Sequence, residues 1–167
     1  HLRGLELVAC TVSAEVMAKV VSGEVDGAVL PIENSLHGSV AEPYDLLLEP
    51  TLLIERESPM RIRHNMIAAP DVKIKDVRRV MSHPVALSQC RRFLASHPEF
   101  EVVPFYDTAG SVKHVMAEDL RNTAGIAPEL AASWYGAKVL LASVEDHADN
   151  FTRFHLVRCE GTACDEF

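Results

Sequence analysis

The chain alternates short apolar runs with segments whose apolar positions recur at helical spacing. In the first part, residues 5–10 and 28–30 predict strands, and the segment between them predicts a helix that is capped by Ser13 and ended by Gly23. After the loop that follows Leu30, apolar residues again recur every three or four positions and predict a helix over 40–48. The first part therefore follows a strand and helix order.

A second series has the same order. Residues 51–57 and 61–69 predict two extended runs around a turn at Ser58-Pro59. These runs are expected to connect two lobes of the protein. A strand near 79–81 then leads through Ser82-His83-Pro84 into an apolar helix. The remaining predicted elements are a strand over 102–106, a helix capped by Thr108, a strand over 125–127, a helix over 129–135 closed by Gly136, and strands over 139–141 and 152–158.

This order of elements predicts an α/β protein with parallel sheets that are covered by helices. In such sheets, ligands bind beyond the carboxyl ends of the strands. Those ends carry Asn34 and Ser35, Ser82, and Thr108. We expect two lobes. Residues 1–65 and 145–167 form the first, because the last strand returns to it, and residues 66–144 form the second.

Charge and apolar content exclude several classes of partner. The 16 Lys and Arg residues against 24 Asp and Glu residues give a net charge of −8, which argues against binding to nucleic acid or to an anionic membrane. No segment approaches the roughly 20 uninterrupted apolar residues of a membrane span. We therefore expect a small-molecule ligand.

The cysteines and histidines indicate no metal site. The four cysteines form no Cys-x-x-Cys pair, and the eight histidines show no metal-ligand spacing. Cys10 and Cys90 lie in apolar segments and are interpreted as buried thiols, which suits a reducing compartment such as the cytoplasm. We expect no metal and no cofactor.

The loop after Leu30 is rich in short hydrogen-bonding side chains. Pro31 is expected to end the strand, and Asn34 and Ser35 stand at a predicted helix start. Taken alone, these residues more often cap a helix than bind a ligand. Ser82 and Thr108 are even more ordinary as caps. Thr152 is ordinary as a strand residue, and Arg153 as a solvated residue.

Four motifs that occur together and in order favour ligand binding over purely structural roles for these residues. They are Pro31-Ile32-Glu33-Asn34-Ser35, Ser82-His83-Pro84 with Gln89-Cys90, Asp107-Thr108-Ala109, and Asn150-Phe151-Thr152-Arg153-Phe154. Their content and order resemble the catalytic domain of prephenate dehydratase, with arogenate dehydratase as a sibling, over nearly the whole chain.

The resemblance implies a fold and a reaction. The fold is two-lobed, like the type II periplasmic binding proteins, with helices flanking each sheet and the substrate in an interlobe cleft. In the reaction, prephenate loses carbon dioxide and water to give phenylpyruvate, a step of L-phenylalanine biosynthesis. We expect the given sequence to lack the family's glycine-rich opening strand before Leu5 and its carboxy-terminal regulatory domain. Val85 stands where a Gln commonly follows Ser-His-Pro.

The resemblance also assigns roles. Thr152 is the catalytic residue, a hydroxyl donor to the departing ring hydroxide. The substrate-binding residues are Asn34, Ser35, Ser82, Gln89, Thr108, Arg153 and Phe154. Convergent helix N-termini and the Arg153 guanidinium would attract the two substrate carboxylates. Glu33 more often pairs structurally than catalyses, and His37 and His83 receive no role.

Two other interpretations stay open. The enzyme alternative is arogenate dehydratase, whose substrate has an amino group in place of the side-chain keto group. The other class is a noncatalytic module that binds a small acid. We also expect a homo-oligomer in the cytoplasm, with a subunit number that the sequence does not fix.

Overall fold

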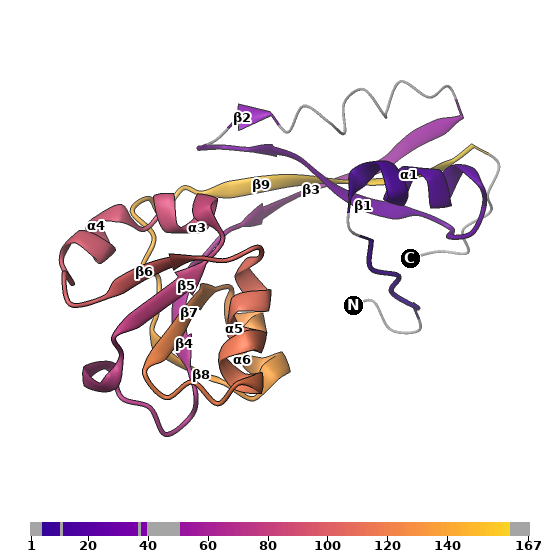
Figure 1. Ribbon diagram of the computed structural model, residues 1–167. Helices are drawn as coiled ribbons and strands as arrows, with labels where there is room; N and C mark the ends of the chain where they lie inside the picture. The colour runs from indigo at the N-terminus through magenta and orange to yellow at the C-terminus, as the bar shows by residue number, and fades with distance from the viewer. Residues whose placement is uncertain (1–4, 11, 37, 40–50, 161–167) are drawn as a thin grey trace. The chain divides into compact units, whose positions relative to one another are not determined.

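The computed structural model describes residues 5–10, 12–36, 38–39 and 51–160. The chain divides into two compact units, each with its own sheet (Figure 1). Unit 1 contains His1–Arg61 and Asn150–Phe167, and unit 2 contains Ile62–Asp149. The chain therefore enters unit 2 slightly before the expected boundary at 65 and leaves it slightly after the expected boundary at 144.

Unit 2 is a five-stranded mixed sheet in the order β6-β5-β7-β4-β8. Strand β5 runs parallel to β6 and β7, whereas β4 is antiparallel to β7 and β8. The elements of unit 2 in chain order are β4 (Asn65–Ala68), the 3-10 turn η1 (Ile74–Asp76), β5 (Arg79–Ser82), α3 (Pro84–Ser88), α4 (Arg91–Ala95), β6 (Glu101–Pro104), α5 (Thr108–Ala117), β7 (Thr123–Ala127), α6 (Glu129–Tyr135) and β8 (Lys138–Leu141).

Helices cover both faces of this sheet (Figure 1). Successive residues of a strand point to opposite faces, and the neighbours Met66 and Ile67 of β4 accordingly belong to different apolar clusters. Met66 packs with Leu87 of α3, and Ile67 packs with Val112 of α5. Every residue of β4 and β7 is buried, as is typical of strands covered on both sides.

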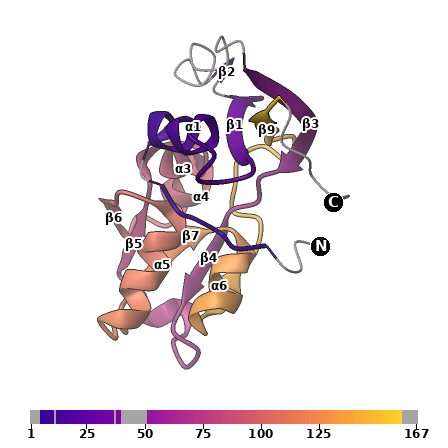
Figure 2. The same cartoon turned by 90° about the vertical axis from the view of Figure 1, so that its right-hand side faces the viewer.

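Unit 1 is a four-stranded antiparallel sheet with one helix packed on it (Figure 2). The sheet order is β2-β1-β9-β3, so the last strand of the described chain lies between strands from its first third. The elements are α1 (Ser13–Val21), β1 (Ala28–Asn34), β2 (Gly38–Ser39), β3 (Leu52–Arg61) and β9 (Phe151–Cys159). Met17 of α1 packs against Leu30, Ile32 and Val157.

The expected α/β fold with two sheets flanked by helices is confirmed, but several of its details are wrong. The sheet of unit 1 contains no parallel pair among its described strands. β1 and β2 follow each other through a short turn, and β9 comes from the far end of the chain, so the βαβ order that predicts parallel pairing does not apply to this sheet. Residues 5–10 form no strand, and most of them are exposed. The helix expected over 40–48 lies outside the described residues.

The two prolines expected to interrupt strands lie within them. Strand β3 continues through Ser58 and Pro59, because β3 is an edge strand and pairs only with β9. Strand β1 continues through Pro31 to Asn34, with a bulge between Pro31 and Glu33. Edges and bulges are the places where a sheet tolerates a residue without an N–H.

Several expected helix starts are also wrong. Val12, not Ser13, is the N-cap of α1, and Asp107, not Thr108, caps α5. The single helix expected after Pro84 is two short helices, α3 and α4, that meet at Gln89 and Cys90. The ending of α6 is confirmed, since Gly136 adopts the left-handed conformation with φ +66°.

Candidate functional site

Thr152 lies on β9, the strand that joins β1 to β3 in unit 1. Its hydroxyl oxygen accepts a hydrogen bond from the side-chain amide of Asn34, with Nδ2 and Oγ1 3.1 Å apart. A hydroxyl that accepts through oxygen keeps its hydrogen for donation. The arrangement therefore suits the donor role that the sequence predicts for Thr152.

Asn34 joins the end of β1 to the start of β9 rather than starting a helix. Its Nδ2 donates to Asn150 Oδ1 at 2.8 Å and to the carbonyl of Phe151 at 3.2 Å, and its Oδ1 accepts from the Leu36 amide at 3.0 Å. Ser35 follows in the turn, where its amide donates to the Phe151 carbonyl at 2.9 Å and its Oγ accepts from the Phe151 amide at 3.0 Å. The expected helix start at Asn34 and Ser35 is thus a strand-ending turn.

Strand alternation separates Arg153 from its motif neighbours. Thr152 and Phe154 point to one face of β9, and Arg153 points to the other. There the Arg153 guanidinium lies 3.7 Å from the Glu33 carboxylate and 3.5 Å from that of Glu57. Arg153 is half exposed, so these ion pairs are weak, and a hollow of about 160 Å³ lies beside it.

Ser82 ends the parallel strand β5 of unit 2 and is fully buried. Its hydroxyl donates to the carbonyl of Ile126 at 2.6 Å, and its own carbonyl accepts from the Phe105 amide at 2.8 Å. Both contacts tie β5 to its neighbours. The structure thus gives Ser82 a sheet-fastening role at the expected strand end.

Gln89 lies where α3 ends and the chain turns into α4. Its side chain is buried, with Oε1 2.7 Å from Nε2 of His64. The spacing of seven residues between Ser82 and Gln89 would be two turns of one helix, but Ser82 belongs to β5 and α3 begins only at Pro84. The position of the Gln89 side chain is thus determined by buried neighbours such as His64 and not by a shared helix face with Ser82.

Thr108 is the first residue of α5 and is partly exposed. The helix is capped by Asp107, whose Oδ2 accepts from the Gly110 amide at 2.6 Å. A Cβ on Gly110 would lie 2.9 Å from that same oxygen and 2.9 Å from the Tyr106 hydroxyl. Glycine at 110 therefore allows Asp107 and Tyr106 to close over the helix start.

Few positive charges are available at these positions. The Asp107 carboxylate already occupies the N-terminus of α5, and Arg153 is shared by two carboxylates. Helix α3 has only five residues, and its first turn is capped by His83, whose Nδ1 accepts from the Val85 amide at 3.2 Å. The expected electropositive site therefore stays a prediction.

The described residues offer neither a metal cluster nor a membrane-spanning helix. Among them, no three His, Cys, Asp or Glu side chains are placed to hold a metal ion. No helix of the described segments is long and apolar enough to cross a bilayer.

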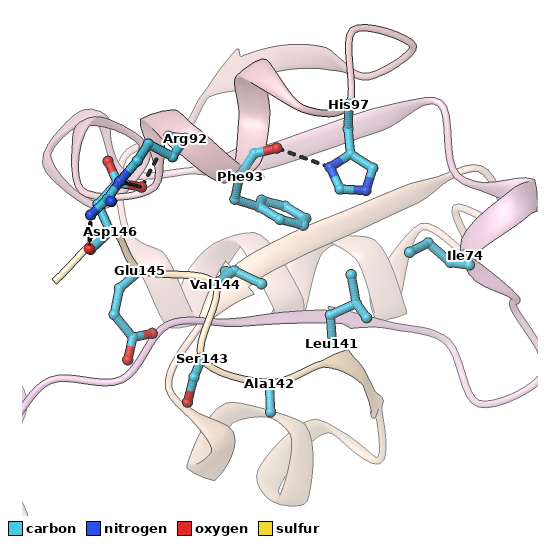
Figure 3. A pocket seen from close by; sticks show the side chains of 10 residues that line it. All are labelled: Ile74, Arg92, Phe93, His97, Leu141, Ala142, Ser143, Val144, Glu145 and Asp146. Carbon is cyan, nitrogen blue, oxygen red and sulfur yellow. Dashed lines mark hydrogen bonds and ion pairs between the residues drawn. The ribbon is translucent and has the colours of Figure 1, made fainter. Parts of the chain in front are cut away.

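A hollow of about 670 Å³ in unit 2 lies between α4 and residues 141–146 (Figure 3). Its lining includes Ile74, Phe93 and His97 but none of the expected site residues. The expected site residues therefore lie outside this hollow. It adjoins the segment that supports Gln89, which accepts an amide hydrogen bond from Asp146 at 2.7 Å.

The sequence does not single out two polar residues that the structure buries. Asn150 is fully buried and accepts from Asn34, although the sequence marks it only as part of a motif. His64 is 4% exposed and contacts Gln89. A histidine shortly before the apolar end of an extended run is the available signal, but periodicity does not reveal its partner.

Comparison with known proteins agrees with the four motifs. Arogenate dehydratase/prephenate dehydratase 2, chloroplastic, from Arabidopsis thaliana is 44% identical over 137 residues, which make up 81% of this chain and 35% of that protein. This chain thus spans about a third of the length of that relative.

Solved structures give the same fold. The prephenate dehydratase of Arthrobacter aurescens in complex with L-Phe matches with a TM-score of 0.82 and 34% identity, over 96% of this chain and 53% of that one. GqqA, described as a novel type of quorum quenching acylase, matches with a TM-score of 0.84 and 31% identity, over 98% of this chain and 59% of that one. The family model for prephenate dehydratase covers residues 2–162, and the chain therefore belongs to the prephenate dehydratase family.

Proposed function

We propose that this chain catalyses the decarboxylating dehydration of prephenate to phenylpyruvate, as a carbon-oxygen lyase of L-phenylalanine biosynthesis. Membership of the family supports the reaction class. The observation that carries the proposal is the contact between Asn34 and Thr152, which holds the hydroxyl of the predicted catalytic residue by its oxygen.

The reaction breaks two bonds and needs one proton. The ring carboxylate leaves as carbon dioxide, its bonding electrons move into the ring, and the ring hydroxyl leaves with a proton as water. Thr152 donates its O–H hydrogen bond to the departing oxygen, where negative charge develops. A single preorganised donor of this kind is worth about 3 to 4 kcal/mol in the transition state. Donation from Asn34 to Oγ1 polarises the same hydroxyl.

The other expected residues are proposed to bind the substrate. Phe154 shares a strand face with Thr152 and supplies an apolar wall for the ring that becomes aromatic. Gln89 and Thr108 offer amide and hydroxyl groups to carboxylates. Arg153 points to the opposite face of β9 and pairs with Glu33 and Glu57, so its contact with a substrate carboxylate stays a prediction. Three of the expected residues are proposed to support the site through their own hydrogen bonds: Asn34 to Thr152, Ser35 to Phe151, and Ser82 to Ile126.

The decisive experiment is turnover by the full-length protein that contains this chain. We expect phenylpyruvate to form from prephenate. Arogenate is assayed beside it, because the Arabidopsis relative is named for both activities. A kcat/KM that favours arogenate would replace prephenate as the substrate, and binding of either acid without product would favour the noncatalytic module.

Acylase activity is one further alternative, because the similar structure GqqA is described as a quorum quenching acylase. An acylase assay on the same preparation separates it from a dehydratase. Since the proposed chemistry breaks carbon-carbon and carbon-oxygen bonds and no acyl bond, acylase turnover without phenylpyruvate formation would overturn the proposal.

We further propose that the protein acts as a homo-oligomer in the cytoplasm. Within the described part of the chain, Cys10 and Cys90 form no disulfide, which supports a reducing compartment. The Arabidopsis relative is named chloroplastic, so fractionation of the source cells is the test of the compartment. Light scattering of the purified protein tests the subunit number.

A further inference from the structure

His64 and Gln89 form a buried pair in unit 2. His64 is 4% exposed and Gln89 is 7% exposed, and His64 Nε2 lies 2.7 Å from Gln89 Oε1. An amide oxygen only accepts hydrogen bonds, so this contact requires the proton on Nε2 of the imidazole. The pair therefore fixes both the tautomer of His64 and the side of the Gln89 amide that faces it.

The environment of Nδ1, the other ring nitrogen of His64, indicates the role of this residue. His64 Nδ1 is buried and has no hydrogen-bond partner among the described residues. Burying an unpaired polar atom destabilises a fold, and an apolar side chain of similar shape would avoid that penalty. A histidine at this position is therefore a poor choice for packing alone, whereas it suits a residue that must supply an N–H at Nε2.

The backbones of both residues are held by the same short segment, residues 144–146. The His64 carbonyl accepts from the Val144 amide at 2.8 Å, and the His64 amide donates to Glu145 Oε2 at 3.0 Å. The Gln89 carbonyl accepts from the Asp146 amide at 2.7 Å.

Asp146 also fixes the helix that follows Gln89. Its carboxylate accepts from the Arg91 and Arg92 amides, both at 3.0 Å, and thereby caps α4. Figure 3 shows Asp146 beside Arg92. Because main chain and side chain are both anchored, the Gln89 amide has one supported orientation.

We propose that His64 is a positioning residue for Gln89. By donating from Nε2 to Oε1, it turns the amide nitrogen of Gln89 away from itself, so that the NH₂ group serves as a donor toward a substrate carboxylate. The opposite orientation would present an amide oxygen to an anion and repel it. This inference rests on the proposed function, in which Gln89 binds the substrate.

The test compares His64 variants in the full-length protein. His64→Leu removes the donor, His64→Gln returns an N–H at the reach of Nε2, and His64→Asn is polar but too short. Loss of one positioning hydrogen bond is expected to raise KM for the turned-over substrate about tenfold, with kcat nearly unchanged. His64→Gln is expected to restore most of the affinity, and His64→Asn is not.

A double-mutant cycle separates positioning from general support. In a Gln89→Met background, His64→Leu should raise KM no further, because the amide it orients is gone. A full tenfold increase in that background would overturn the inference, as would equal KM values for His64→Gln and His64→Asn. If His64→Leu does not fold, the comparison of the Gln and Asn variants at matched thermal stability still decides.

The two proposals fail in different ways. If the wild-type protein turns over neither prephenate nor arogenate, the proposed function is wrong. If it turns one of them over but the His64 variants behave additively with Gln89→Met, only the positioning role is wrong.

Discussion

At the scale of single residues, the contact between Asn34 and Thr152 supports a sharp prediction. Thr152→Ala should lower kcat about a hundredfold or more while ligand affinity is largely kept, because the lost hydroxyl acts mainly in the transition state. Steady-state kinetics beside calorimetric binding of the substrate measures both quantities. Thr152→Ser, which keeps a hydroxyl on the same strand face, is the matched control and should retain most of the turnover. An unchanged kcat in Thr152→Ala would remove Thr152 from the chemistry.

Cys90 gives a prediction about pH. Burial raises the pKa of the Cys90 thiol from its ordinary value of 9.0 to about 12, with smaller effects from the carboxylates of Asp146 and Glu145. Since the folded state keeps the proton, stability is fully present below pH 9.0 and falls as pH rises toward 12.

The pH effect is measured by urea unfolding of the wild type and Cys90→Ala. Between pH 9 and 10, the free energy of unfolding should fall by about 1 kcal/mol more in the wild type, which alone carries the thiol at this position. The alanine variant is expected to be less stable at every pH because of its cavity, but that loss does not depend on pH. Parallel curves for the two proteins would contradict the assignment.

At the scale of elements, helix α5 lies very close to strand β7 at Gly125. A Cβ at that position would lie 2.8 Å from Ser111 Oγ and from Val112 Cγ2, and 3.1 Å from the Val112 backbone nitrogen. Gly125→Ala should therefore lower the free energy of unfolding by about 1 to 3 kcal/mol, since the helix must move away from the sheet. Chemical denaturation measures the change.

Gly136→Asn is the control for that glycine substitution. Gly136 has φ +66°, and apart from its own chain neighbours no atom of the described residues lies within 4 Å of the place that a Cβ would take there. Asparagine tolerates the left-handed conformation. The stability of this variant should stay close to that of the wild type. A loss equal to that of Gly125→Ala would mean that the cost arises from backbone freedom and not from packing.

Elements that depend on local signals could be predicted, and those that depend on pairing could not. Helix α6 ends at Gly136 as expected, since a left-handed glycine is a local signal. The passage of β3 through Pro59 was missed, because edge position is a property of the sheet. The candidate site shows the same division. Thr152 lies on the expected strand, but the opposite orientation of Arg153 and the His64 contact follow from strand register and tertiary packing.

At the scale of the whole molecule, the two units have different kinds of chain path. Unit 2 is continuous, and every strand of its sheet lies within Ile62–Asp149. Unit 1 is discontinuous, because β9, which pairs with both β1 and β3, comes from the far end of the chain. All of unit 2 therefore lies between Asn34 and Thr152 in the sequence. The contact between these two residues forms only when β9 pairs with β1.

This difference predicts how the fragments behave. Residues 62–149 should fold alone, with a cooperative thermal transition by circular dichroism, because their core clusters need no residue of unit 1. Residues 1–61 alone should show no such transition, since β1 and β3 have no β9 between them. Adding a peptide of residues 150–160 should then restore strand signal to the 1–61 fragment. A cooperative transition of residues 1–61 without that peptide would show that β1 and β3 can form a stable sheet by another pairing. The idea that unit 1 needs β9 in order to fold would then be wrong.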